Sequence, residues 1–237
     1  MKEILVTGGS RGIGLEFARQ YLERGFRVFA ASRHPEDSRP LQRLKAEHGE
    51  RLVVLQVDVG HEESRRDLVK ALSVETERLD LVINSAGVLS GNEEFCLPFG
   101  DLRQEDLCKT LLINSVAPLM IVERVLPLLK RGMNPVVVNI SSDNGSISRR
   151  THAGKYGYCA SKAALNMMTK ILSVELRSYG IVIVSLHPGW VKTSMTRNEN
   201  APLEPSESIG GMRQVIESLS MEDTGRFLDW KGNEIPW

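Results

Sequence analysis

The sequence predicts one α/β domain built on a doubly wound parallel sheet of about seven strands, with helices on both faces. Short apolar runs alternate with helix-like stretches along the whole chain. A glycine-rich turn joins the first apolar run to the first helix-like stretch. No composition break, internal repeat or low-complexity tract divides the chain, so we expect residues 1–237 to form a single domain.

Composition narrows the classes of function. The chain carries 30 basic and 30 acidic side chains, which argues against a nucleic-acid partner, because such proteins normally have a basic excess. No apolar run approaches the ~18 residues of a membrane span, so we expect no membrane partner. The N-terminus shows no signal-peptide pattern, and three cysteines lack metal-site spacing (Cys96, Cys108, Cys159). We therefore expect a reducing, cytoplasmic setting and no metal.

The first strand and the turn after it have the context of a dinucleotide-binding site. Ile4-Leu5-Val6 predicts a buried parallel strand, and the residues from Leu15 to Leu22 have helical spacing. Between them lies a TGxxxGxG turn that contains Gly8, Ser10, Arg11, Gly12, Ile13 and Gly14. Glycines let the backbone approach a pyrophosphate, and a helix N-terminus offers free N–H groups. The pattern predicts a Rossmann-type nucleotide site, with a plain tight turn as the alternative.

The end of the second strand bears on the choice of nucleotide. Residues 26–31 predict this strand, and Ser32 and Arg33 follow it. An acid at this position would bind an adenosine 2′-hydroxyl, whereas arginine suits a 2′-phosphate. No acid stands at the tip, and Arg11 adds a second positive charge. We expect NADP(H) to be preferred, with NAD(H) as the alternative cofactor; the competing interpretation is that both arginines are solvated loop charges.

The third and fourth strands end in polar or small residues. A short polar helix is expected over 41–48, and Leu52–Val57 predicts the third strand. Asp58 ends it and can either contact adenine or cap the helix that starts near Glu62. Leu79–Ile83 predicts the fourth strand, which runs into Asn84-Ser85-Ala86-Gly87. Small residues there allow a cofactor to lie against the strand end.

A long helix is predicted from Gln104 to Leu129. Asn114 interrupts its apolar face, and a buried asparagine needs partners, so it is either a satisfied core amide or a site residue. Pro118 lies inside this helix and should kink it near Asn114, which would free a backbone carbonyl.

The fifth strand, predicted over 136–140, leads to Ser141-Ser142 and then to a basic loop. The loop carries Arg149, Arg150, His152 and Lys155, for which a solvated surface and a contact with an anionic substrate are both open. Tyr158 then opens a helix predicted to end at about Tyr179.

Tyr158 and Lys162 lie four residues apart, on one face of that helix. A phenol titrates near ~10 in water, so it exchanges protons poorly at neutral pH. An ammonium one turn away should favour the phenolate and lower the pKa of Tyr158. YxxxK also occurs in many helices as an exposed tyrosine and a solvated lysine, so the pair needs its context.

The last quarter predicts a sixth strand over 181–186, a turn at Pro188-Gly189, and a helix from about Ser206 to Leu219. Residues 192–206 have no clear periodicity, and long loops in compact domains are often binding loops. The tail from 225 to 237 predicts a seventh strand and a turn, with tryptophans that pack.

Taken together, these motifs resemble the short-chain dehydrogenase/reductases of the classical type. The matching residues are TGxxxGIG at 7–14, NSAG at 84–87, Asn114, Ser142, YxxxK at 158–162 and Pro188-Gly189. The stretch from Tyr158 to Met195 and the ending GRFLDW…PW resemble the sniffer and C-factor-like branch of carbonyl reductases. Ser85 is a departure, because the family usually has a second asparagine there.

The resemblance implies an NADP(H)-dependent oxidoreductase that transfers hydride between the nicotinamide and a carbonyl or alcohol substrate. Tyr158 would be the acid in reduction and the base in oxidation, and Lys162 would hold the nicotinamide ribose and lower the pKa of Tyr158. Ser142 would bind the carbonyl oxygen, with Ser141 as the alternative. Asn114 would fix a water in a proton relay.

The resemblance also implies the cofactor contacts. In order along the chain, they are Gly8, Ser10, Arg11, Gly12, Ile13, Gly14, Ser32, Arg33, Asp58, Val59, Asn84, Ala86, Gly87, Pro188, Gly189, Val191 and Thr193, with Tyr158 and Lys162. The family usually pairs through its long helices, which implies a homodimer or homotetramer. A signalling or regulatory protein that binds NAD(P), as proposed for C-factor-like members, is the alternative function.

Overall fold

The structure is a computed structural model, and it describes residues 1–89, 99–195 and 200–237. Seven strands form one sheet: β1 (Glu3–Thr7), β2 (Arg27–Ser32), β3 (Leu52–Gln56), β4 (Leu81–Asn84), β5 (Val136–Ile140), β6 (Val182–His187) and β7 (Phe227–Asp229). Its order is β3-β2-β1-β4-β5-β6-β7, and all neighbouring strands are parallel. The predicted doubly wound sheet of seven strands is therefore confirmed.

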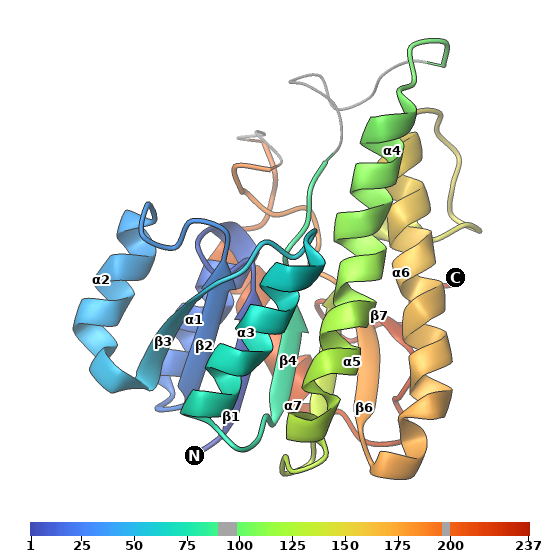
Figure 1. Cartoon of the computed structure of the whole chain (residues 1–237). Helices are drawn as coiled ribbons and strands as arrows, with labels where there is room; N and C mark the ends of the chain where they lie inside the picture. The colour runs from blue at the N-terminus through green and yellow to red at the C-terminus, as the bar shows by residue number, and fades with distance from the viewer. Residues whose placement is uncertain (90–98, 196–199) are drawn as a thin grey trace.

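The main helices are α1 (Gly12–Glu23), α2 (Arg39–His48), α3 (Glu62–Glu75), α4 (Gln104–Leu111), α5 (Ala117–Leu129), α6 (Tyr156–Glu175) and α7 (Pro205–Ser218). They form two layers, one on each face of the sheet (Figure 1). One core packs α1, α2 and α7 against the sheet, and the other packs α3, α5 and α6 against the opposite face. Strands buried on both faces explain the nearly continuous apolar runs in the sequence.

Sheet topology decides where a ligand can bind. The strand order reverses between β1 and β4, and crevices outside the carboxyl ends of strands at such a point bind ligands. Thr7, at the end of β1, accepts hydrogen bonds from the backbone N–H groups of Ser85 and Ala86, both at 3.2 Å. The two diverging strand ends are thus joined by one threonine hydroxyl.

A π-helical turn, Leu112–Val116, lies between α4 and α5, where the sequence predicts a kink; the kink itself stays a prediction. Asn114 lies inside this turn and is buried. Pro118 directly follows this turn, and its missing N–H removes one hydrogen bond to the carbonyls of the preceding turn. The stretch Gln104–Leu129 is 26 residues long with a mean hydropathy of 1.6, enough by length and composition to cross a membrane, although half of its apolar window is buried in the protein.

Other element boundaries differ from the sequence predictions by a few residues. The helix of the tyrosine–lysine pair begins at Tyr156, after Lys155 in a left-handed conformation (φ 54°). A short 3-10 turn, Arg177–Tyr179, follows its end. The last helix begins at Pro205, so the long loop before it is shorter than predicted; its residues 196–199 lie outside the described part of the chain.

Candidate active site

The glycine turn after β1 is shaped to admit another molecule's phosphates. Gly8 (φ 70°) and Gly12 (φ 55°) have backbone conformations that favour glycine. A Cβ at Gly8 would lie 2.9 Å from the backbone of Ala86, and one at Gly14 would collide with the carbonyl of Gly8. Helix α1 has no acidic residue in its first turn, so its positive end is not neutralised there. These residues fit a nucleotide pyrophosphate.

The end of β2 fits a phosphate on the adenosine ribose. The hydroxyl of Ser32 is buried and has no hydrogen-bond partner among the described residues. Arg33 and Arg11 are exposed, and neither forms an ion pair with another described residue. Ser38 donates a hydrogen bond to the carbonyl of Ser10 at 2.6 Å, which ties the loop after β2 to the glycine turn. The predicted 2′-phosphate residues therefore lie at one edge of the crevice.

Asp58 does not cap helix α3, which was one of the two predictions for this carboxylate. Its Oδ1 accepts a hydrogen bond from the N–H of Gly60 at 2.9 Å, in the turn before the helix, whose N-cap is His61. The carbonyl of Val59 accepts a hydrogen bond from the buried Arg65 at 2.6 Å. The residues predicted to border adenine are thus held by local hydrogen bonds, and their contact with adenine stays a prediction.

The side chain of Asn84 donates a hydrogen bond inside the sheet, and its buried Oδ1 has no hydrogen-bond partner among the described residues, so its contact with the ribose stays a prediction. Its Nδ2 donates to Asn139 at 2.9 Å, and Asn139 donates to Thr169 of α6 at 2.8 Å. Ser185 of β6 donates to the same threonine at 3.1 Å. This polar network, Asn84, Asn139, Thr169 and Ser185, crosses three adjacent strands and fixes α6 on the sheet.

Asn114 joins the end of β4 to α6. Its Nδ2 donates to the carbonyl of Val88 at 2.9 Å and to Ser161 at 3.0 Å, and its Oδ1 accepts from the N–H of Val88 at 2.8 Å. A Cβ at Gly87 would lie 3.3 Å from Asn114 and 4.0 Å from Lys162 Nζ. The asparagine is therefore a satisfied buried amide that also borders the site, and its predicted role in a water relay stays a prediction.

Of the two adjacent serines, Ser142 lies beside Tyr158 and Ser141 does not. Ser141 is buried and donates to Asn166 at 2.7 Å, so its hydroxyl is directed into the core. The Ser142 hydroxyl lies close enough to the phenol of Tyr158 to act on the pKa of that phenol. Ser142 also donates to Asp143 Oδ1 at 3.1 Å. Two hydroxyl groups thus adjoin at the carboxyl end of β5.

Lys162 completes this group. Its Nζ is buried, donates to the carbonyl of Ile140 at 2.7 Å, and lies 5.8 Å from the centre of the Tyr158 ring. One helix turn therefore brings the ammonium beside the phenol, as the spacing predicts.

The predicted effect of this ammonium on the tyrosine is wrong in this structure. Burial has the largest effect and raises the pKa of Tyr158 to about 12. The neighbouring hydroxyl of Ser142 opposes that rise, and the charge of Asp143 adds to it. Burial also lowers the pKa of Lys162 to about 8. At neutral pH the phenol therefore keeps its proton and the lysine keeps its charge.

The turn after β6 lies near the glycine turn after β1. A Cβ at Gly12 would lie 3.6 Å from the side chain of Thr193, so this turn approaches the glycine turn. Pro188 accepts a hydrogen bond from Ser208 at 2.5 Å, and Gly189 has φ 81°. Val191 pairs with Leu203 as an isolated bridge, which closes the base of the predicted substrate loop.

Arg150 and the cluster of His34, Glu36 and Asp37 are charged groups to which we assign no catalytic or metal-binding role. Arg150 of the basic loop donates to Asn144 at 3.1 Å and to the carbonyls of Ala153 and Gly154, so it holds the loop.

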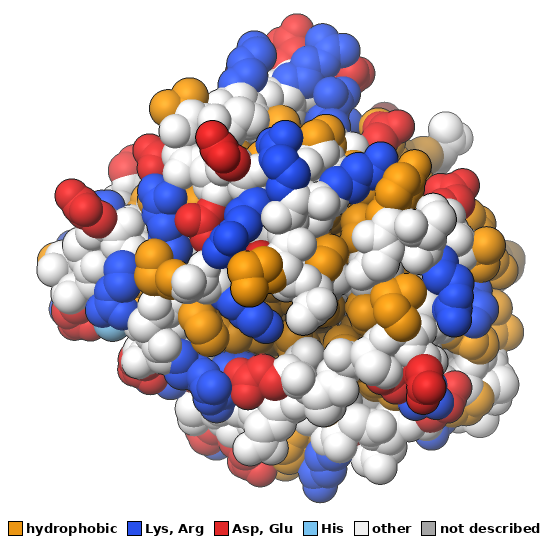
Figure 2. Space-filling view, turned by 90° about the horizontal axis from the view of Figure 1, so that it is seen from below, with side chains coloured by type: hydrophobic (Ala, Val, Ile, Leu, Met, Phe, Trp, Pro, Cys, Tyr) orange, Lys and Arg blue, Asp and Glu red, His pale blue; other side chains and the backbone are white. Residues whose placement is uncertain are grey.

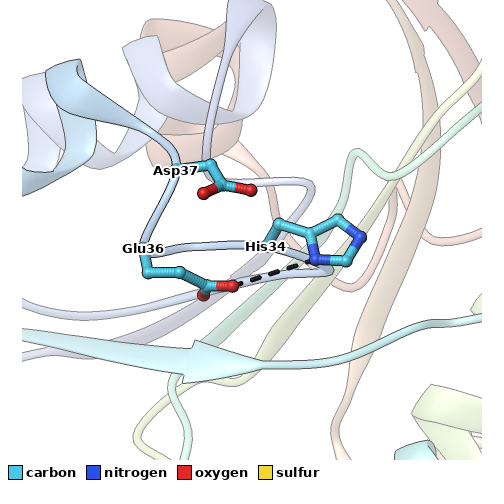
Figure 3. Close-up of side chains that lie close together, drawn as sticks. All are labelled: His34, Glu36 and Asp37. Carbon is cyan, nitrogen blue, oxygen red and sulfur yellow. Dashed lines mark ion pairs between the residues drawn. The ribbon is translucent and has the colours of Figure 1, made fainter.

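His34, Glu36 and Asp37 bring ligand atoms within 4.8 Å of one another, but all three are exposed. Figure 3 shows His34 facing Glu36 in a turn, at 3.8 Å. Exposed acidic groups often occur without a metal, and we assign none here.

Sequence reasoning missed Asp143 and the polar network under the site. Asp143 directly follows Ser142 and is exposed. An asparagine in the middle of the apolar run Val136–Ile140 was the available signal for the network. The thiol of Cys159 donates a hydrogen bond to Asn144 Oδ1 at 3.8 Å, and Cys108 forms no disulfide with another described residue; Cys96 lies outside the described residues.

A family model described as short chain dehydrogenase matches residues 2–204. The chain belongs to the short-chain dehydrogenase family. It is 41% identical to C-signal of Myxococcus xanthus over 167 residues, which are 70% of this chain and 98% of that relative.

This chain has the same fold as solved carbonyl reductases. The chain resembles carbonyl reductase Sniffer of D. melanogaster with a TM-score of 0.93 and 33% identity over 100% of both chains. NADPH-bound carbonyl reductase from chicken fatty liver gives a TM-score of 0.91 with 33% identity, over 100% of this chain and 99% of the other. The family prediction and the carbonyl reductase likeness are confirmed.

Proposed function

We propose that this short-chain dehydrogenase is a carbonyl reductase that prefers NADP(H) and uses Tyr158 as its acid. The observation that carries the proposal is the adjoining pair of hydroxyls, Ser142 and Tyr158, with the ammonium of Lys162 beside them. Two donors directed at one oxygen stabilise the negative charge that grows there during reduction. NADPH, when bound, supplies the hydride.

Each residue has a separate task. Ser142 redirects its single hydroxyl proton from Asp143 Oδ1 to the carbonyl oxygen of the substrate and orients that oxygen. Tyr158 donates a second hydrogen bond and then gives its proton to the same oxygen, since an alkoxide is a much stronger base than a phenolate. Lys162 is held at the carbonyl of Ile140 by a 2.7 Å hydrogen bond and would bind the nicotinamide ribose. A phenol protonated at neutral pH favours reduction over oxidation.

The proposed preference for NADP(H) over NAD(H) depends on the residues that follow β2 and on Arg11 of the glycine turn. The buried, unpartnered hydroxyl of Ser32 and the exposed Arg33 and Arg11 suit a 2′-phosphate. The NADPH-bound chicken enzyme, which resembles this chain over its whole length, supports the same choice. NAD(H) would lack the phosphate that these groups bind, so it should serve less well.

The proposal is tested by following NADPH and NADH absorbance with a panel of aldehydes, ketones, diketones and quinones. We expect consumption of NADPH with at least one class of carbonyl, and slower consumption of NADH. Retention of neither nucleotide by the purified protein would contradict the proposal. So would consumption that continues at the same rate without any carbonyl compound.

A signalling role is the second candidate, and the likeness to C-signal favours it. The intact tyrosine, serine and lysine of this chain favour the enzyme. A signalling effect independent of catalysis would persist in a Tyr158→Phe variant, whereas an effect that depends on the reaction would disappear with turnover.

We also propose that the protein forms a homodimer through the outer face of α6. Met167, Ile171 and Val174 follow helical spacing there and are 62%, 51% and 72% exposed. Hydrophobic side chains gather on the right of Figure 2, the side on which α6 lies in Figure 1. An exposed apolar stripe of this kind is typical of a protein interface, and a second copy of the same helix would match it.

A further inference from the structure

One carboxylate stands directly beside the two hydroxyls of the site. Asp143 begins the 3-10 turn Asp143–Gly145, immediately after Ser142. Its Oδ1 accepts hydrogen bonds from Ser142 and from Asn144 Nδ2, both at 3.1 Å. The residue is exposed, so the carboxylate is oriented by the protein on one side and open on the other.

The charge of Asp143 affects the pKa of side chains on two other elements. Burial raises the pKa of Tyr158 on α6, and the charge of Asp143 adds to that rise; burial lowers the pKa of His187 at the end of β6, and the charge of Asp143 opposes that fall. The carboxylate therefore lies near the phenol that would protonate the substrate. Asp143 therefore differs from a surface carboxylate that lies far from Tyr158.

Asp143 also has unused capacity to accept hydrogen bonds. Within the described ranges, no residue donates to its Oδ2 and no cation pairs with it. The nearby Arg150 is occupied by Asn144 and by the carbonyls of Ala153 and Gly154. An ionised carboxylate accepts strong hydrogen bonds and repels a second anion.

We propose that Asp143 is a specificity-determining residue, which selects carbonyl substrates with a hydroxyl or ammonium group on the carbon next to the carbonyl and rejects α-keto carboxylates. This inference rests on the proposed reductase function. A carbonyl oxygen on Ser142 and a donor on the adjacent carbon are about one hydrogen-bond length apart, which matches the 3.1 Å between Ser142 Oγ and Asp143 Oδ1. A carboxylate at the same place on the substrate would face Asp143 directly.

The test uses four ketones that share one phenyl ketone skeleton: acetophenone, α-hydroxyacetophenone, protonated α-aminoacetophenone and benzoylformate. The quantity measured is kcat/KM of each compound divided by that of acetophenone, so a general change in activity cancels. We compare the unchanged enzyme with Asp143→Asn, which keeps the shape and removes the charge, and with Asp143→Glu, which keeps the charge. Asp67→Asn is the matched control, because Asp67 pairs with Lys70 at 2.9 Å on the exposed side of α3.

In Asp143→Asn we expect the benzoylformate ratio to rise about tenfold or more, because removal of a nearby like charge relieves a repulsion of this order. The aminoacetophenone ratio should fall by a similar factor, and the hydroxyacetophenone ratio should fall less. Asp143→Glu should restore the charge preference in part, and Asp67→Asn should keep the original ratios.

Binding of the same four compounds to the NADP-loaded enzyme, by calorimetry, gives the ranking independently of turnover. Ratios that are equal in the unchanged enzyme and in Asp143→Asn would overturn the role of Asp143 and leave the reductase proposal standing. A shifted binding ranking without turnover of any carbonyl would support Asp143 and overturn the reductase proposal. If no compound binds or reacts, both are wrong.

Discussion

At the scale of single residues, the proposed chemistry depends on opposite effects of burial on the pKa of an acid and of a base. Burial raises the pKa of Tyr158 to about 12 and lowers that of Lys162 to about 8, because both charged forms lose hydration. The lysine ammonium therefore titrates closest to physiological pH, while the phenol stays protonated. A protonated phenol is the form needed to donate to a new alkoxide.

The pH dependence of reduction follows from the lysine. We expect kcat/KM with NADPH to be constant at pH values below about 7 and to fall as the pH rises through about 8, where Lys162 loses its charge. In Lys162→Arg, activity should be lower but the fall near that pH should disappear, because arginine stays charged. A profile of the unchanged enzyme that stays level well above pH 9 would contradict this role.

At the scale of elements, the glycine turn and the polar network position the residues of the site. Helix α6 carries both Tyr158 and Lys162, and Thr169 attaches the same helix to β5 and β6 through hydrogen bonds. The turn between β1 and α1 keeps its shape only without side chains at Gly8 and Gly14. Both features can be tested by substitutions with closely matched controls.

Substitution of two glycines by alanine should have opposite effects. In Gly14→Ala the new methyl group would collide with the carbonyl of Gly8, so we expect loss of NADPH binding and a lower thermal midpoint. Gly210→Ala in helix α7 meets no atom within 4 Å and should stabilise the fold by about 1 kcal/mol, because alanine favours helix. Equal NADPH affinity in both variants would show that the turn does not bind phosphate.

The polar network should contribute to stability. Thr169→Val keeps the shape but leaves Asn139 and Ser185 without their acceptor, so we expect a loss of about 1–3 kcal/mol in the free energy of unfolding, measured in urea. Thr110→Val is the control, since the one partner of its hydroxyl among the described residues is the carbonyl of Asp106 in its own helix. We expect Thr169→Val to be less stable than Thr110→Val, and equal free energies of unfolding would contradict the role of the network.

At the scale of the whole molecule, the proposed dimer depends on the stripe on α6. Ile171→Glu should shift the protein toward a monomer in sedimentation at a fixed concentration, because a charge would be buried in the interface. Val74→Glu is the control, since Val74 is 87% exposed on the separate helix α3. A monomeric unchanged protein at micromolar concentration would rule out the dimer.

The sheet, the glycine turn and the long helix with an irregular turn at Asn114 could be predicted from the sequence because each has a local pattern: apolar runs, glycine spacing, and a proline near an asparagine on an apolar face. The network of Asn84, Asn139, Thr169 and Ser185 could not, because it joins residues that the fold brings together across strands. The pKa of Tyr158 was predicted in the wrong direction, since spacing shows the neighbouring lysine but not the extent of burial.

The most direct test of the proposed chemistry compares Tyr158→Phe with Tyr156→Phe, which alters an exposed tyrosine in the same helix. NADPH affinity is measured by fluorescence, and turnover is measured with whichever carbonyl the unchanged enzyme reduces best. We expect both variants to bind NADPH as the unchanged protein does, and only Tyr158→Phe to lose turnover, by about a hundredfold or more. Turnover in Tyr158→Phe equal to that of the control would contradict proton donation by Tyr158.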